Sequence, residues 1–169
     1  MSPRELAYCS VFGAAAFWLP VVFHLLHLGH IFMPMYLPLM ALAFFVRPPA
    51  AALTALSVPL LSGAMTGMPP LMPPIAPVMA IELAIMALLA GLLRTRLPRL
   101  PLRVVLAVVL IIGRLINLGL MLVAAHVLVL SPTLVAGFSL LSGWPGILLM
   151  MAVIPQLMRL AIQHNHMPL

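Results

Sequence analysis

The chain has 169 residues, of which 65% are hydrophobic and only 6% are charged, and its formal net charge is +6. A water-soluble domain of this size needs more charged residues to cover its surface, so the composition predicts an integral membrane protein. Every basic residue is an arginine, and the only acids are Glu5 and Glu82. Without lysine or aspartate the chain has no phosphate-binding P-loop and no carboxylate pair for Mg²⁺, so we expect no ATPase and no other enzyme activity.

Apolar segments separated by prolines, glycines and arginines predict six helices. In chain order we place them at Leu6–Leu28, Ile31–Val46, Pro49–Thr66, Ala76–Leu93, Leu102–Leu130 and Thr133–Ile162. The second is short and contains Pro34 and Pro38, so we expect it to be kinked or to span only part of the bilayer. We therefore expect an all-α fold, a single integral membrane bundle of six transmembrane helices over residues 1–169, with no second domain.

The arginines are distributed asymmetrically about these helices. Those near helix ends are Arg4, Arg47, Arg94, Arg96, Arg99, Arg103 and Arg159. If successive helices alternate in direction, all of them lie on one side, and the loops on the opposite side contain no arginine. The positive-inside rule then predicts cytoplasmic termini for a multi-pass protein of the plasma membrane. Because these arginines lie at the ends of apolar segments rather than on one solvated face, the basic pI of about 11.5 does not indicate a nucleic-acid partner.

Three histidines lie at the outer end of the first predicted helix and in the loop that follows. His24 and His27 have the i,i+3 spacing of one helix face, and His30 follows Gly29. Three interpretations stay open: histidines packed at the membrane interface, contacts to an organic substrate, or a site for Zn, Ni or Co. No carboxylate or thiolate supports a metal here, so we assign no metal ligands and no cofactor.

Two charges lie within predicted helices, where a charge costs at least ~2.5–3.5 kcal/mol unless it faces protein or water. Glu82 is about 9 Å from the outer end of the fourth helix, and Arg114 in the fifth helix is about 12 Å from the outer face. This similar depth predicts either a buried ion pair or a pair that opens to hold a polar ligand. Asn117 adds a donor and an acceptor on the same helix surface as Arg114.

Two other interpretations bear on this region. His126 lies near the outer end of the fifth predicted helix, about 180° around it from Asn117, and reaches the site only if that helix is distorted. The polar groups can also form a clamp between helices that binds no ligand.

Three stretches together form a familiar pattern: GHIFMPMYLP (29–38), PLLSGAMTGMPPL (59–71) and IELAIMALLAGLL (81–93). This combination resembles the substrate-binding S components of energy-coupling factor (ECF) vitamin transporters, and the resemblance covers about residues 28–93. It implies six helices, cytoplasmic termini, and energy from two cytoplasmic ATPases joined to a membrane coupling protein. It also implies a substrate site in the outer half of the bundle, beneath the outer loops and among the fourth to sixth helices. We expect that site to include Glu82, Arg114, Asn117, His27, His30, Met68 and His126.

The resemblance has one departure, at the expected docking surface for the coupling protein. S components commonly dock through an Ala-x-x-x-Ala pattern in their first helix, and this chain has none there. The nearest pairs of small residues are Ser10 with Ala14 and Cys9 with Gly13. Small residues four apart allow close helix approach whatever their identity, so we assign partner binding to Ser10 and Ala14.

These observations predict the substrate-capture subunit of an ATP-driven ECF-type transporter for a small water-soluble vitamin, vitamin precursor or similar micronutrient. The nearest alternative is a nickel or cobalt uptake subunit that uses His24, His27 and His30. A further alternative, of another class, is a structural membrane subunit in which Glu82 and Arg114 only hold helices together.

Overall fold

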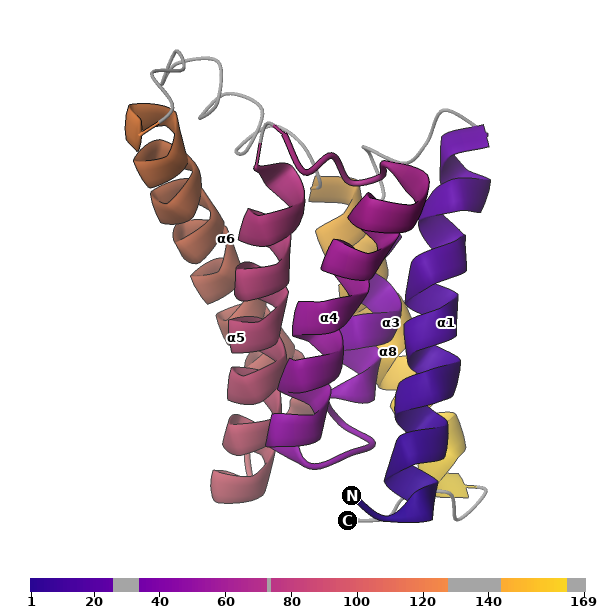
Figure 1. Cartoon of the computed structure of the whole chain (residues 1–169). Coiled ribbons are helices and arrows are strands. Elements are labelled where there is room, and N and C mark those ends of the chain that lie inside the picture. The colour runs from indigo at the N-terminus through magenta and orange to yellow at the C-terminus, as the bar shows by residue number, and fades with distance from the viewer. Residues whose placement is uncertain (26–33, 73, 128–143, 164–169) are drawn as a thin grey trace.

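The computed structural model describes residues 1–25, 34–72, 74–127 and 144–163. All regular structure in these ranges is helical. The elements are α1 (Pro3–Leu25), α3 (Tyr36–Leu42), α4 (Pro48–Thr66), α5 (Ile75–Arg96), α6 (Leu102–Val127) and α8 (Trp144–Gln163). Figure 1 shows these helices gathered into one bundle. The all-α class predicted from the sequence is therefore confirmed.

Five of the described helices, all except α3, are long and apolar enough to span a membrane. They carry large apolar side chains on their outer surfaces, for example Leu53 on α4, Ile111 on α6 and Leu148 on α8, each more than half exposed. Exposed apolar surface on every long helix is unfavourable in water and favourable in lipid. The chain is accordingly a multi-pass membrane protein.

The first helix begins earlier than predicted, at Pro3 rather than Leu6. The Ser2 hydroxyl accepts a hydrogen bond from the Glu5 N–H at 3.2 Å, and the Ser2 N–H donates to Glu5 Oε2 at 2.9 Å. This reciprocal pair is a capping box, and proline is favourable at the first helical position. Hydropathy alone places the start of the helix too late because the capping residues are polar.

Glu5 also ties α1 to the residue before α4. Arg47 donates from Nε to Glu5 Oε1 at 2.9 Å and from Nη2 to Glu5 Oε2 at 3.0 Å, and its backbone N–H donates to Oε1 at 3.2 Å. The two side-chain bonds form the bidentate geometry that a guanidinium and a carboxylate favour. One of the two acidic residues of the chain is thus committed to joining helix ends.

The short helix α3 lies inside the bundle. Six of its seven residues are buried, among them Leu39, Met40 and Leu42, which are fully enclosed by the other helices. The predicted helix Ile31–Val46 extends too far at its C-terminal end, because residues 43–46 form turns rather than helix. Seven helical residues measure about 10 Å, so α3 by itself does not cross a bilayer.

The helices α4 and α5 are joined by a loop that folds back onto the end of α4. Gly67 has a φ of +73°, a left-handed conformation that glycine adopts without strain. The Ser62 hydroxyl donates to the Met68 carbonyl at 2.6 Å, and the Thr66 hydroxyl donates to the same carbonyl at 3.2 Å. The polar and glycine residues of this stretch therefore fix the loop against the helix.

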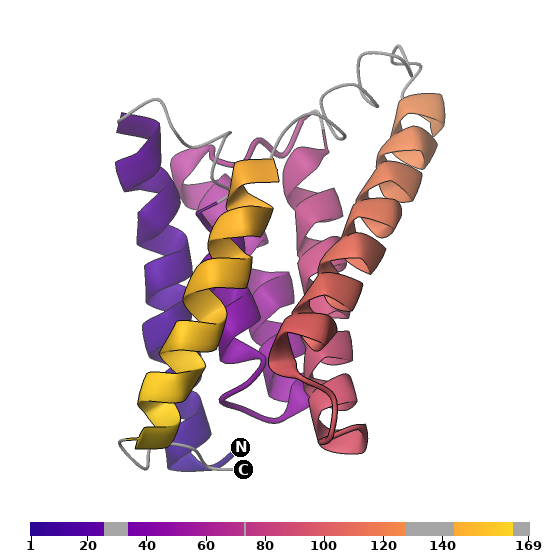
Figure 2. The same cartoon turned by 180° about the vertical axis from the view of Figure 1, so that it is seen from behind.

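The helix α6 lies against α5 along its first half and leans away from the bundle along its second half, as Figures 1 and 2 both show. Its buried residues follow the same division, with six of the seven between Val105 and Asn117 and only Ala125 beyond them. Asn117 therefore lies where the closely packed part of α6 ends.

Gly113 of α6 lies in close contact with Met86 of α5. A Cβ at this position would lie 2.3 Å from Met86 Sδ and 2.9 Å from Met86 Cγ, whereas a Cβ at Gly119 would meet nothing within 4 Å. Overpacking a close contact typically costs ~1–3 kcal/mol. We expect Gly113→Val to lower the thermal unfolding temperature clearly and the matched control Gly119→Val to change it little. Equal melting temperatures in detergent would show that this contact does not constrain the two helices.

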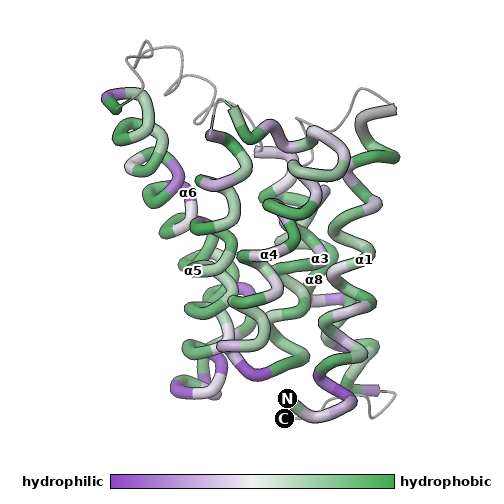
Figure 3. The backbone as a smooth tube through the Cα atoms, viewed as in Figure 1, coloured by the Kyte–Doolittle hydropathy of each residue, from purple (hydrophilic) through white to green (hydrophobic). Residues whose placement is uncertain are grey.

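Seven of the eight arginines lie at one end of the bundle, here called the arginine end. They are Arg4 at the start of α1, Arg47 before α4, Arg94 and Arg96 at the end of α5, Arg99 and Arg103 around the start of α6, and Arg159 near the end of α8. Figure 3 shows hydrophilic residues gathered at this end and apolar residues along the helices between the two ends. The opposite end carries the loop between α4 and α5.

Candidate functional site

Glu82 is the one acidic side chain in the interior of the bundle. It lies on α5 and is only 1% exposed. Its Oε2 atom accepts a hydrogen bond from the Tyr36 hydroxyl of α3 and a second, at 2.7 Å, from Asn117 Nδ2 of α6. The carboxyl group therefore joins three helices through one oxygen atom. We call Tyr36, Glu82 and Asn117 the carboxyl cluster.

The packing of α5 against α6 determines which polar residues meet. Gly113 lies against Met86, and one turn along each antiparallel helix Asn117 lies against Glu82. Because residues four apart lie on the same helix face, the glycine that lets the helices approach also sets the amide beside the carboxyl group. The contact of Glu82 with Asn117 is thus a consequence of helix register.

Tyr36 enters the cluster from the first residue of α3. Its side chain is buried, with 3% exposed, and its hydroxyl is the polar end of an otherwise apolar ring. Tyr36 is not among the site residues predicted from the sequence. A signal was present, because Tyr36 is one of only two tyrosines and lies within a predicted apolar helix, where its hydroxyl needs a partner.

Arg114 lies three residues before Asn117 on α6 and is half-buried. Its positive charge is close enough to act on Glu82 and on Tyr36 by coulombic interaction. The structure thus surrounds the carboxyl group with two neutral donors at contact distance and a cation in electrostatic range.

Hydrogen bonding of the buried polar groups is complete within the described residues, because no buried side-chain nitrogen or oxygen there lacks a partner. This matters in a membrane, where an unpaired carboxyl group is much more costly than in water. A polar solute that binds at the carboxyl cluster must therefore either replace one of these existing hydrogen bonds or make additional contacts with the atoms around the cluster. Chemically, the arrangement offers an acceptor, an amide, a phenol and a nearby cation.

Two predicted site residues that the structure describes, His126 and Met68, do not join the carboxyl cluster. His126 is exposed on α6, nine residues beyond Asn117, a separation of about 14 Å along a helix. The Met68 side chain is 40% exposed in the loop after α4. His27, His30 and the side chain of His24 lie outside the described residues, so the histidine cluster stays a prediction. Within the described ranges, no three His, Cys, Asp or Glu side chains form a group that could hold a metal ion.

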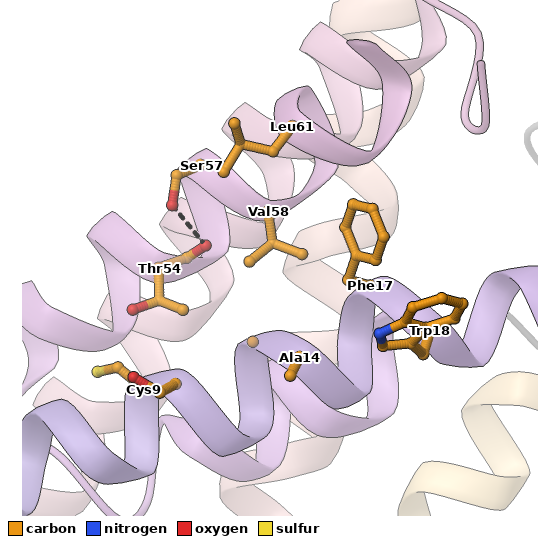
Figure 4. A pocket seen from close by; sticks show the side chains of 10 residues that line it. Cys9, Ala14, Phe17, Trp18, Thr54, Ser57, Val58 and Leu61 are labelled. Carbon is orange, nitrogen blue, oxygen red and sulfur yellow. Dashed lines mark hydrogen bonds between the residues drawn. The ribbon is translucent and has the colours of Figure 1, made fainter. Parts of the chain in front are cut away.

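A second feature is an open groove of about 440 Å³ between α1 and α4. The α1 side of it is formed by the small residues Cys9, Ser10, Gly13 and Ala14 and, further along the helix, by the aromatic Phe17 and Trp18. Figure 4 shows the α4 side, formed by Thr54, Ser57, Val58 and Leu61. Both residues assigned to partner binding, Ser10 and Ala14, are exposed at this groove.

The hydroxyl groups of the groove are hydrogen-bonded within their own helices. Ser10 donates to the Leu6 carbonyl at 2.9 Å, and Thr54 donates to the Ala50 carbonyl at 2.9 Å. Ser57 donates to the Leu53 carbonyl at 3.0 Å. These hydroxyl groups therefore leave no unmet hydrogen-bond donor in the groove, and the small side chains from Cys9 to Ala14 form the part of it suited to close contact with another helix in lipid.

Comparisons of this chain with protein-family models, with curated proteins and with solved structures found no match.

Proposed function

We propose that this protein is the substrate-capture subunit of an ATP-driven uptake transporter of the ECF type, for a small water-soluble vitamin, vitamin precursor or similar micronutrient. The observation that carries the proposal is the carboxyl cluster, a hydrogen-bonded glutamate with a half-buried arginine beside it, inside a membrane bundle. Polar and ionisable residues inside a membrane are costly and commonly mark the path or site of a polar solute. The sequence resemblance over residues 28–93 gives the transporter class.

In this proposal the arginine end faces the cytoplasm, both termini are cytoplasmic, and the chain crosses the plasma membrane six times. The second crossing comprises the segment that contains α3. The carboxyl cluster then lies in the outer half of the membrane, where a solute arriving from outside reaches it. Arg114 and Asn117 contact the solute together with Glu82, and His27, His30, Met68 and His126 contribute from the outer loops and helix ends.

The proposed partners are a membrane coupling protein and two cytoplasmic ATPases. The groove between α1 and α4 supports the first of these, because Ser10 and Ala14 leave room for a helix of the coupling protein. The ATPases supply the energy, since the chain itself contains no lysine and no aspartate for a nucleotide site.

A second candidate function is a structural membrane subunit. It is favoured by the complete hydrogen bonding of the carboxyl cluster, which needs no ligand to satisfy its buried atoms. The two candidates differ in ligand binding, because a capture subunit is stabilised by its solute and a structural subunit by none.

The energy requirement tests the proposal directly. Vesicles that contain only this chain are expected to bind the solute without accumulating it and to hydrolyse no ATP. Vesicles that also contain the coupling protein and both ATPases are expected to accumulate it when ATP is supplied. Uptake of labelled solute measures both. Accumulation by the chain alone, without ATP, would make it a secondary transporter.

A further inference from the structure

The connection between α5 and α6 concentrates positive charge at one corner of the arginine end. Arg94 and Arg96 lie in the last turn of α5, Arg99 lies in the connection, and Arg103 is the second residue of α6. We call these four residues the arginine corner. Arg96, Arg99 and Arg103 are exposed, and Arg94 is half-buried, with a long hydrogen bond of 3.4 Å from its Nη1 to the Pro98 carbonyl.

The chain has no acidic side chain to balance this charge. Its only two acids are Glu5 and Glu82. Glu5 is bound to Arg47 through both carboxylate oxygens, and Glu82 is buried in the carboxyl cluster. No acidic side chain of the chain is therefore left to pair with the four positive charges of the arginine corner, which makes the corner available to an external anion.

The corner is held in place rather than free in solvent. Leu93, Leu100 and Leu102 pack against the hydrophobic core, and the Leu97 and Leu100 N–H groups donate to the carbonyls of Leu93 and Leu97, closing tight turns. The arginines thus project from an anchored connection. Holding charged groups in place lowers the entropy cost of ordering them around an anion.

Apolar side chains lie beside the arginines. Leu97 is 47% exposed and Val104 is 44% exposed, next to Arg96 and Arg103 in the chain. The corner therefore presents guanidinium groups together with apolar surface at the end of two membrane-spanning helices. That is the chemistry of an anionic phospholipid, whose phosphate lies at the interface and whose acyl chains continue along the helices.

We propose that the arginine corner, Arg94, Arg96, Arg99 and Arg103, is a binding site for the headgroup of an anionic phospholipid. Each arginine that contacts the headgroup is expected to contribute an attraction equivalent to about a fivefold change in affinity. The site does not depend on which solute the protein binds or on which ATPases it joins.

The test uses the full chain in detergent and native mass spectrometry with two lipids of equal acyl chains, phosphatidylglycerol and phosphatidylcholine. The protein is expected to bind phosphatidylglycerol preferentially. The double variant Arg96→Gln/Arg99→Gln is expected to lose about 25-fold in affinity for it, because two of the charges are removed. The matched control is Arg4→Gln/Arg159→Gln, which removes the same charge from exposed arginines of α1 and α8 and is expected to retain the preference.

Three results would overturn the proposal. Equal loss in both double variants would mean that total charge, rather than this corner, attracts the lipid. Equal affinity for glycerol phosphate and for phosphatidylglycerol would identify a free phosphate rather than a lipid as the ligand. Unchanged lipid binding in Arg96→Gln/Arg99→Gln, together with loss of assembly with the coupling protein, would assign the corner to an acidic protein partner.

Discussion

The substitution Glu82→Gln is expected to weaken binding of the transported solute by roughly ten- to a hundred-fold while leaving a folded protein, since a charge-assisted hydrogen bond contributes ~1.5–3 kcal/mol. Glutamine has nearly the same shape and keeps an oxygen that can accept a hydrogen bond, as Glu82 does from Tyr36 and Asn117. Arg114→Gln is expected to act in the same direction. Titration of the purified variants with the solute, followed by thermal unfolding, measures the loss.

The matched control for charge removal is Arg4→Gln, which changes an exposed arginine at the start of α1. It is expected to leave affinity unchanged. Unchanged affinity in folded Glu82→Gln and Arg114→Gln proteins would remove both residues from the solute site, although the chain could still belong to a transporter.

A structural role for the carboxyl cluster leads to a different pattern of stabilities. Asn117→Leu removes a donor from a buried carboxyl group and is expected to cost ~1–3 kcal/mol of stability. In the triple variant Tyr36→Phe/Glu82→Leu/Asn117→Leu all three polar groups of the carboxyl cluster are removed together, so none of them is left unpaired and part of that loss is recovered. Recovery of stability without any effect of Glu82→Gln on solute binding would support the structural candidate.

The second large effect is expected at the groove between α1 and α4. Ala14→Phe fills the space that a partner helix requires, so uptake is expected to fall to background, about tenfold or more, while solute binding is retained. Val11→Phe is the matched control, because Val11 is an exposed residue of the same helix that does not line the groove. Solute uptake and solute binding are measured for each variant.

Two results would contradict this assignment. Full uptake by Ala14→Phe would show that the coupling protein docks elsewhere. Equal loss of uptake in Ala14→Phe and Val11→Phe would indicate a general disturbance of α1 in the membrane rather than a docking surface.

Most of the helices could be located from the sequence because apolar length is a strong signal in a membrane protein. The predicted Pro49–Thr66 agrees with α4 to one residue, and the predicted Ala76–Leu93 lies within α5. The end of α5 extends to Arg96 because arginines can continue a helix beyond the apolar span. A boundary drawn from hydropathy stops at the last apolar residue and misses this turn.

The second predicted helix was less accurate for a different reason. Its apolar residues 43–46 are buried in turns rather than in helix. A buried turn and a buried helix are both rich in apolar residues, so composition does not distinguish them. Arg47 then adopts an extended conformation, with ψ at 145°, because the residue before a proline avoids the helical region. The two consecutive prolines after Arg47 were the signal for an earlier helix end.

Most residues of the candidate site could be predicted from the sequence, but the hydrogen bonds between them could not. Depth along each helix placed Glu82 and Asn117 in the same region, and the structure joins them by a hydrogen bond. Depth does not reveal rotation about the helix axis, so the sequence did not show that Asn117 donates directly to Glu82. The register that selects Asn117 depends on the contact of Gly113 with Met86, a packing detail that one sequence does not disclose.

Mass spectrometry of the molecules that co-purify with the detergent-extracted protein shows whether the bundle captures one small organic solute. We expect one organic solute, bound in near-equal amount to the chain and largely lost from Glu82→Gln. Nickel or cobalt in its place would rule out an organic solute, and the same solute in equal amount on Glu82→Gln would rule out capture at the carboxyl cluster.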